Sequence, residues 1–278
     1  MYKTIVIPSN KEMINNISSD AILLGIKDLS VNMPFYITLD ELKKIKTKKE
    51  IFISLNKNFN NGELEVLKKT LLELNDLDIK GVFFYDISIV NLKEKLNLKY
   101  DLVWNQEHMT TNYLTVNYWL NKGVNYTCLS NEITTREIKE ITQNTKSKII
   151  IQMFGYVPIM NSKRHLINNY LKEFNLKNKS KINYIEKEEN KYPIIDSENG
   201  TVVYTSKILN GIKDAIDTDL EYILLNSFMI DESKFKEVLE MFKTVNNENK
   251  NEYYEKINNM FNADTLFLHK ETIYKVKK

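Results

Sequence analysis

Three ionisable side chains lie just after two apolar runs and are the strongest candidates for acid–base chemistry. Glu107 and His108 follow the run Leu102–Trp104, and Glu132 follows Tyr126–Leu129. A carboxylate and an imidazole, or two carboxylates, have separated pKa values when they are forced together, and such groups exchange protons near neutral pH. We therefore expect Glu132, with Glu107 or His108, to form a catalytic acid–base set. The alternative is that Glu132 only stabilises the N-terminus of the helix that follows.

The two arginines, Arg136 and Arg164, are a second candidate, because lysine supplies the rest of the 39 Lys+Arg. A planar guanidinium binds carboxylates and phosphates with two parallel hydrogen bonds. Arg136 falls in the first turn of an expected helix, and Arg164 falls in the loop after the next strand. We expect the pair to form a fork for a dicarboxylate or a phosphate. The alternative is that each arginine pairs with a nearby carboxylate.

Four further polar or aromatic side chains are expected to line the same ligand-binding site. They share a position in a loop that leaves the carboxyl end of a strand, where ligands bind in α/β proteins. The four are His165, Tyr156, Asn105 and Asp86.

Metal and cofactor sites are not expected. The three histidines are far apart in the sequence, and no HExxH spacing occurs. The single cysteine, Cys128, excludes an internal disulfide and an iron–sulfur cluster held by cysteines of this chain. A divalent metal bound by oxygen ligands stays open. No GxSxG nucleophile motif is present.

The candidate residues depend on a regular alternation of short apolar runs with helical patterns, which predicts eight strands. Their ranges are Thr4–Ile7, Ala21–Leu24, Ile51–Leu55, Val82–Tyr85, Leu102–Trp104, Tyr126–Leu129, Ile149–Ile151 and Tyr222–Leu225. This α/β alternation predicts a TIM-like (β/α)8 barrel. An open, doubly wound sheet is the alternative, but neither of the glycine-rich phosphate loops typical of that fold occurs.

The alternation breaks once, between the seventh and eighth strands. Gly155 and Pro158 are expected to end regular structure and leave a long loop. Lys181–Ile185 and Val202–Tyr204 predict a β-hairpin insertion over about 176–210, with turns at Tyr192-Pro193 and Asn199-Gly200. Residues 1–244 would then form the barrel. Residues 245–278 would add a helix and two short strands, expected at Thr265–Leu268 and Thr272–Val276.

Composition favours a cytoplasmic protein that does not associate with a membrane. No apolar run approaches the roughly 20 residues of a membrane-spanning helix, and the apolar stretch at the N-terminus is too short for a secretory signal. The net charge of +2 and the pI of about 8.2 do not indicate strong nonspecific binding of nucleic acid. They are compatible with a structured RNA bound at one local patch.

Four segments together resemble the collagenase-like peptidase family U-thirty-two, in particular its short Firmicute members. The most specific segment is FGYVPIMNSKRHL, from Phe154 to Leu166. LSNEI, from Leu129, is similar to a family motif that precedes a helix. Tyr192-Pro193, Asp196, Gly200-Thr201 and Ser206 follow the spacing of a family hairpin, and Ile273–Lys277 resembles the end of short members.

The resemblance implies a barrel-like catalytic domain and a peptidase, or hydrolase-type, site at the carboxyl ends of the strands. Other family members act in tRNA modification by prephenate-dependent hydroxylation of wobble uridine. The resemblance therefore also implies a tRNA-modification factor, acting alone or with a paralogous family subunit; a non-catalytic binding barrel is the third alternative. A peptide or a tRNA is the expected substrate. The sequence leaves the oligomeric state open, and Cys128 alone cannot hold the iron–sulfur cluster of some members.

Overall fold

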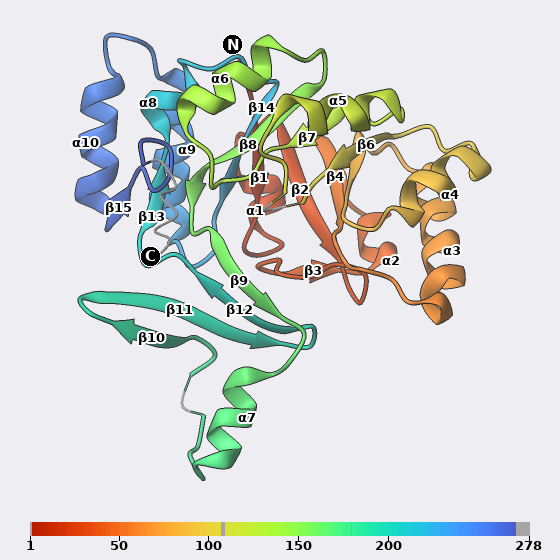
Figure 1. The fold of residues 1–278 in the computed structure, drawn as a ribbon, viewed down its shortest axis with the longest axis horizontal. Helices are drawn as coiled ribbons and strands as arrows, with labels where there is room; N and C mark the ends of the chain where they lie inside the picture. Colours follow the sequence, from red (N-terminus) through yellow and green to blue (C-terminus); the bar gives the residue numbers. More distant parts are fainter. Residues whose placement is uncertain (1, 107–108, 179, 271–278) are drawn as a thin grey trace, which may run out of the picture.

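The computed structural model describes residues 2–106, 109–178 and 180–270, and its centre is a closed barrel of parallel strands (Figure 1). The barrel strands are β1 (Lys3–Ile7), β2 (Ala21–Ile26), β4 (Glu50–Leu55), β5 (Gly81–Phe84), β6 (Asp101–Trp104), β7 (Tyr126–Cys128), β8 (Lys148–Gly155) and β14 (Tyr222–Asn226). Each strand pairs with the next, and β14 pairs in parallel with both β8 and β1. These pairings close the sheet and confirm the predicted eight-stranded barrel.

Helices pack around the outside of the barrel because each buries one apolar stripe. They are α1 (Met13–Asn16), α2 (Leu39–Leu42), α3 (Leu64–Asn75), α4 (Ser88–Leu96), α5 (Tyr113–Asn121), α6 (Thr135–Gln143), α8 (Ile212–Ala215) and α9 (Glu232–Thr244). A short 3-10 helix, η1 (Asn61–Glu63), leads into α3, where Leu67, Leu71 and Leu74 are fully buried. Thr134 begins α6 with a capping box, in which its side chain accepts from the Glu137 backbone N–H.

Aromatic side chains fill the barrel interior and close its amino-terminal end. The ring of Phe52 makes edge contacts with Phe83 and Tyr222, at centroid distances of 5.6 and 5.5 Å. Tyr222 Oη donates a hydrogen bond to Glu50 Oε2 at 2.5 Å, and Lys3 pairs with the same carboxylate at 3.4 Å. Burial, and then the hydrogen bond to Glu50, raise the pKa of Tyr222 far above its ordinary value. The amino-terminal end of the barrel is therefore closed by packed side chains.

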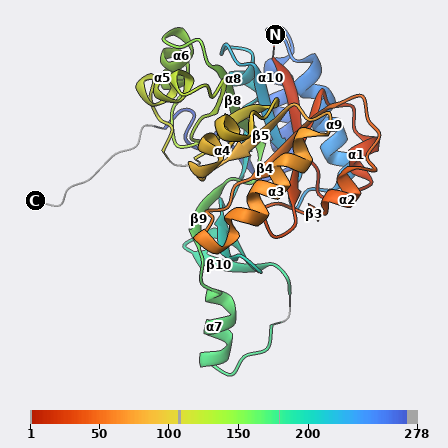
Figure 2. The same ribbon diagram turned by 90° about the vertical axis from the view of Figure 1, so that its right-hand side faces the viewer.

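A small antiparallel sheet lies beyond the carboxyl end of β8, and we call residues 158–204 the lobe. Its elements are β9 (Pro158–Ser162), α7 (Leu166–Glu173), β10 (Asn183–Lys187), β11 (Asn190–Ser197) and β12 (Gly200–Tyr204), with the strand order β10-β11-β12-β9. The lobe has its own small core, centred on Ile167, Ile194 and Val203. Figures 1 and 2 both show it projecting from one end of the barrel, with α7 at its far side.

The lobe is larger than the expected hairpin, and two of the expected breaks are wrong. Pro158 does not end regular structure but begins β9, where its position at the sheet edge tolerates the missing N–H. Tyr192 and Pro193 lie inside β11, paired with Ile185 and Tyr184, so they do not form a turn. The expected turn at Asn199-Gly200 is confirmed, because it joins β11 to β12.

The C-terminal segment packs against the barrel. It includes α10 (Lys250–Met260) and the short strand β15 (Ala263–Asp264), which pairs with β13 (Ile208–Asn210). The expected strand Thr265–Leu268 is wrong: these residues form turns that bury Leu268. Its expected partner, Thr272–Val276, lies outside the described residues. A short strand β3 (Tyr36–Ile37) extends the edge of β2.

Candidate ligand-binding site at the barrel mouth

A cavity of about 490 Å³ lies between the lobe and the carboxyl ends of β2, β4 and β5. Amide side chains come from both sides of it. The barrel loops contribute Asn32, Asn56, Asn58 and Asn60, and the lobe contributes Asn161 and Asn199. The cationic residues at the cavity are Lys57 and Lys163. Amides donate and accept hydrogen bonds, so this wall suits a polar ligand.

Hydrogen bonds join the barrel loops to the lobe on the two sides of the cavity. Asn32 Nδ2 donates to Asn161 Oδ1 at 2.7 Å, and Asn199 Nδ2 donates to the Ser30 carbonyl at 3.3 Å. Asn56 bonds both backbone groups of Val31, at 2.9 and 3.0 Å, and so fixes the loop after β2. Both halves of the cavity are therefore ordered before a ligand binds.

Two carboxylates, Glu63 and Glu198, line this cavity, and Glu63 is paired with a lysine. Lys57 Nζ lies 2.5 Å from Glu63 Oε1, and the Asn60 amide donates to the other carboxylate oxygen at 2.9 Å. The hydrogen bond from Lys57, the Asn60 amide and the charges of Lys57 and Lys163 together hold the pKa of Glu63 below its ordinary value. An anionic ligand would meet Lys163 on this wall, while Glu63 is occupied by local partners.

Aromatic side chains lie on the other side of the mouth, where β8 and β14 end. Tyr204 of β12 stacks on Phe228 at a centroid distance of 4.7 Å. Tyr156 is half-buried; burial, and then the nearby phenol of Tyr184 in β10, raise its pKa above the ordinary value. Gln152 Nε2 donates to the Tyr156 carbonyl at 3.1 Å and fixes the chain as it leaves the barrel. Amides and lysines, together with the aromatic side chain of Tyr85, line the cavity itself, a combination that suits a planar, polar ligand.

Several of the polar strand ends that the sequence singles out hold loops in place. Asp86, an expected anion-site residue, accepts from the backbone N–H of Phe59 at 2.8 Å and of Ser88 at 2.9 Å. Burial alone would raise the pKa of Asp86, but these two amide donors outweigh it and the net pKa is lowered. Asp86 therefore ties α4 to the loop that carries the amide wall.

We expect Asp86→Asn to reduce the free energy of unfolding by about 1 kcal/mol at pH 7, because asparagine keeps one acceptor oxygen but loses the second acceptor and the charge near the helix N-terminus. Since the folded pKa is depressed, the contribution is full above the unfolded pKa of about 4 and is lost as the pH falls through the folded pKa. Urea unfolding at pH 7 and pH 3 measures this. The difference between wild type and variant should shrink at pH 3, whereas Asp78→Asn, at an exposed position, should match wild type at both values.

The expected acid–base set is only partly described by the structure. Glu132 lies on an exposed turn after β7, where its backbone N–H bonds Ser130 Oγ at 3.2 Å. Glu107 and His108 lie outside the described residues. The set therefore stays a prediction.

The two arginines are placed on different parts of the molecule. Arg136 is exposed in the first turn of α6, while exposed Arg164 lies between β9 and α7 of the lobe. In both views α6 and α7 lie at opposite ends of the protein (Figures 1 and 2). β7 and β8 are neighbours, as expected, and β9 carries Arg164 onto the lobe, next to Lys163 of the cavity. The fork of Arg136 and Arg164 stays a prediction.

The two remaining anion-site candidates are also separated. His165 is exposed at the start of α7 on the lobe. Asn105 is half-buried at the end of β6, where its backbone N–H bonds the Phe84 carbonyl at 3.2 Å. Of the candidates that the structure describes, Tyr156 lies on the aromatic side of the mouth. The sequence signal for the amide wall was the run NKNFNN from Asn56, which is easily attributed to general asparagine richness.

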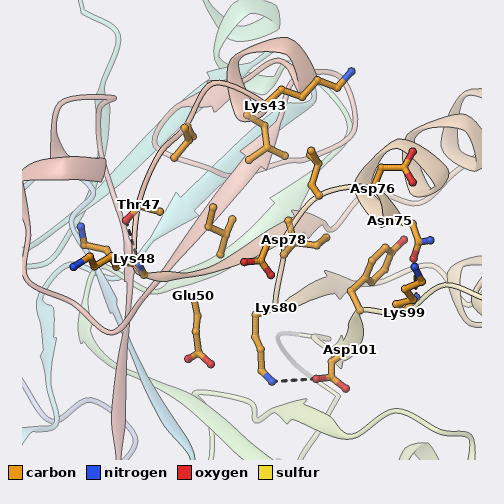
Figure 3. Close-up of a pocket in the computed structure, with 17 residues that line it drawn as sticks. Lys43, Thr47, Lys48, Glu50, Asn75, Asp76, Asp78, Lys80, Lys99 and Asp101 are labelled. Carbon is orange, nitrogen blue, oxygen red and sulfur yellow. Dashed lines mark hydrogen bonds and ion pairs between the residues drawn. The ribbon is translucent and has the colours of Figure 1, made fainter.

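A larger cavity, of about 820 Å³, lies at the opposite end of the barrel, near the start of β4, β5 and β6 (Figure 3). Both lysines and carboxylates line this cavity, and several of them form ion pairs with each other or with residues outside the cavity. Lys80 pairs with Asp101 at 3.4 Å, as Figure 3 shows, and Lys43 pairs with Glu73 at 2.8 Å. Barrel proteins place ligands at the carboxyl ends of the strands, and so we assign the candidate site to the mouth.

Metal-binding clusters and membrane-spanning helices are both absent from the described part of the chain. Over residues 2–106, 109–178 and 180–270, no group of three or more histidines, cysteines or carboxylates is arranged to hold a metal ion. Within the same ranges, no helix has the length and apolar character needed to cross a bilayer. The expectation of no cofactor stays a prediction.

The closed barrel, with a lobe over one side of its mouth, defines a (β/α)8-barrel protein whose candidate site is lined by residues of both the barrel and the lobe. A model of peptidase family U32 matches residues 9–276, so the chain belongs to peptidase family U32. The chain is 27% identical to tRNA hydroxylation protein P2 of Bacillus subtilis (strain 168) over 250 residues, which cover 81% of each protein.

A solved structure also matches most of the chain. Tryptophan synthase subunit alpha from Campylobacter jejuni superposes with a TM-score of 0.41 and 13% identity, over 92% of this chain and 95% of that one. The likeness is distant, and the barrel is defined by its own strand pairing.

Proposed function

We propose that this protein is a tRNA-modification factor that acts in tRNA hydroxylation and binds its RNA substrate at the barrel mouth. The observation that carries the proposal is the cavity at the mouth, which is lined by amide side chains, by Lys163 and by the aromatic side chain of Tyr85. Proteins recognise unpaired RNA bases by stacking them on aromatic rings and bonding their edges, while lysines hold phosphates.

The relationship to tRNA hydroxylation protein P2 supports the same function, because the similarity extends over four-fifths of both chains. A peptidase or other hydrolase is the competing function for a member of this family. Among the described carboxylates around the cavity, Glu63 is paired with Lys57 and the nearby Asp86 accepts from backbone amides, while Glu198 also lines the cavity. A hydrolase would instead depend on Glu132 with Glu107 or His108, and that set stays a prediction.

Binding of tRNA to the purified chain tests this proposal. Lys163→Glu places a negative charge in the wall and should weaken binding about tenfold, since one charged contact to a phosphate is worth about 1 to 2 kcal/mol. Lys44 is also exposed but does not line the cavity. Lys44→Glu should therefore leave the affinity for tRNA unchanged.

The competing function is measured in parallel by turnover of gelatin and peptides. Wild type should not cleave them. Absence of tRNA binding by the wild type, together with peptide cleavage that Glu132→Gln abolishes, would replace the proposed function by the hydrolase.

A further inference from the structure

The far side of the lobe carries exposed aromatic and basic side chains that the mouth does not use. We call this the outer lobe surface and define it by Tyr170, Lys172, Phe174, Lys177 and Lys181, all of which are exposed. The helix α7 buries its other stripe, Ile167 and Leu171, on the small sheet. In Figures 1 and 2 this helix lies on the side of the lobe away from the barrel.

Two rings on α7 form a ready stacking platform. Tyr170 and Phe174 are one helical turn apart, and their ring centroids are 4.7 Å from each other. They are 58% and 60% exposed, although aromatic side chains of this size usually bury most of their area. Leu176, 53% exposed, extends the same apolar strip. An exposed strip of this kind on the surface of a folded protein marks an interaction site.

The charge around the platform identifies the kind of partner. Residues 158–187 contain seven lysines and arginines against two glutamates, a net charge of +5. The whole chain has a net charge of +2, so the remaining residues have a net charge of −3. The positive charge is concentrated in the segment that carries α7, because residues 188–204 of the lobe have one lysine against four acidic residues. A polyanion would be attracted to the outer lobe surface.

The lysine content of the outer lobe surface favours a nucleic acid over a protein as its partner. The cores of protein–protein interfaces are enriched in aromatic residues and depleted in lysine. On the outer lobe surface, Lys172 and Lys177 instead flank Phe174 in the sequence, and Lys181 follows. Aromatic rings interleaved with basic groups are the pattern of surfaces that bind single-stranded nucleic acid.

We propose that the outer lobe surface binds single-stranded RNA, with a base stacked on Tyr170 and Phe174 and phosphates on Lys172, Lys177 and Lys181. This inference rests on the proposed function and adds to it a second contact with the tRNA, to an unpaired loop and away from the mouth. The loop would be held by the lobe while another part of the RNA occupies the mouth.

Fluorescence anisotropy of the full chain with a labelled anticodon stem–loop RNA tests this. Tyr170→Ala with Phe174→Ala should weaken binding at least tenfold, since stacking one base on an aromatic ring typically contributes roughly tenfold or more. Lys172→Glu, Lys177→Glu and Lys181→Glu together should also weaken it at least tenfold. They should lower the slope of log affinity against log salt by about 2, near 0.7 for each phosphate that a lysine no longer neutralises.

Matched controls come from α5, where Tyr118 is 56% exposed and Lys122 lies over its ring. Tyr118→Ala and Lys122→Glu should bind as wild type does, and Tyr170→Phe with Phe174→Tyr should retain binding. Lobe variants that bind like wild type would overturn the inference while leaving the proposed function intact. Equal competition by an RNA duplex would overturn the single-strand assignment. Wild type that binds no RNA would remove both the inference and the function on which it rests.

Discussion

Replacing Gly155 by alanine should destabilise the protein by about 3–5 kcal/mol, at the upper end for a single substitution. Gly155 is the last residue of β8 and has a φ of +107°, a region that side chains with a Cβ atom rarely adopt. A Cβ atom there would lie 2.3 Å from the Asn226 carbonyl oxygen and 2.9 Å from the Asn226 Cβ. Both neighbouring atoms belong to β14, so neither can move without disturbing the barrel closure.

Thermal and urea unfolding measure this effect. We expect the melting temperature of Gly155→Ala to fall by roughly 6–20 °C, given about 2–4 °C per kcal/mol for a domain of this size. Gly62→Ala is the matched control, because nothing lies within 4 Å of the Cβ that it would add. If both variants unfold together with wild type, then the close approach of β8 to β14 is not as described.

Gly155 lies where the chain passes from the barrel to the lobe. After Gly155 the chain leaves the barrel, and Leu209 of the antiparallel strand β13 pairs with Gly155. Gly200, with a φ of +115°, allows an equally close approach of β12 to the Ser162 carbonyl on β9. At both glycines, two backbone segments therefore approach each other more closely than a side chain would permit.

The barrel could be predicted because its signals are local. Each strand is a short β-branched or aromatic run, and each helix repeats apolar residues such as Leu67, Leu71 and Leu74 at helical spacing. All eight expected strands overlap observed ones, because a parallel strand buried on both faces must be apolar throughout.

The lobe was harder to predict because its strands are short, polar and half-exposed. Pro158 normally marks a break, but here it begins an edge strand whose partner, β12, is about 40 residues further along the sequence. Pro193 is likewise tolerated inside β11. Pairing between segments so distant leaves little trace in local periodicity, which is why the sequence indicated only one hairpin.

The sequence could predict where the candidate site lies but not which residues line it. Its location at the carboxyl ends of the strands follows from the barrel, yet the residues that form it come mostly from the asparagine-rich loop after β4 and from the lobe. Arg136 and Arg164 were expected to form one fork because β7 and β8 are adjacent; β9 carries Arg164 onto the lobe, and the fork stays a prediction. Asp86 shows that a carboxylate at a strand end can act through backbone amides alone.

The C-terminal histidine shows another contact that sequence spacing does not reveal. His269 Nε2 lies 3.1 Å from an oxygen of Asp214, whose side chain is 5% exposed, and Thr135 donates to the same oxygen at 2.6 Å. Asp214 is more than 50 positions from each of these partners in the sequence. His269 therefore links the C-terminal segment to α6 and α8.

The measurement that tests the central claim most directly is the nucleoside content of tRNA from cells that lack this chain. Wobble hydroxyuridine is quantified by mass spectrometry in a deletion strain that has no redundant hydroxylation pathway. If the chain acts in tRNA hydroxylation, the hydroxylated nucleoside should fall at least tenfold and the unmodified uridine should rise by the same amount. Expression of wild type should restore the nucleoside, and Lys163→Glu should restore it less well. Hydroxyuridine that is unchanged in the deletion strain would contradict the proposed function.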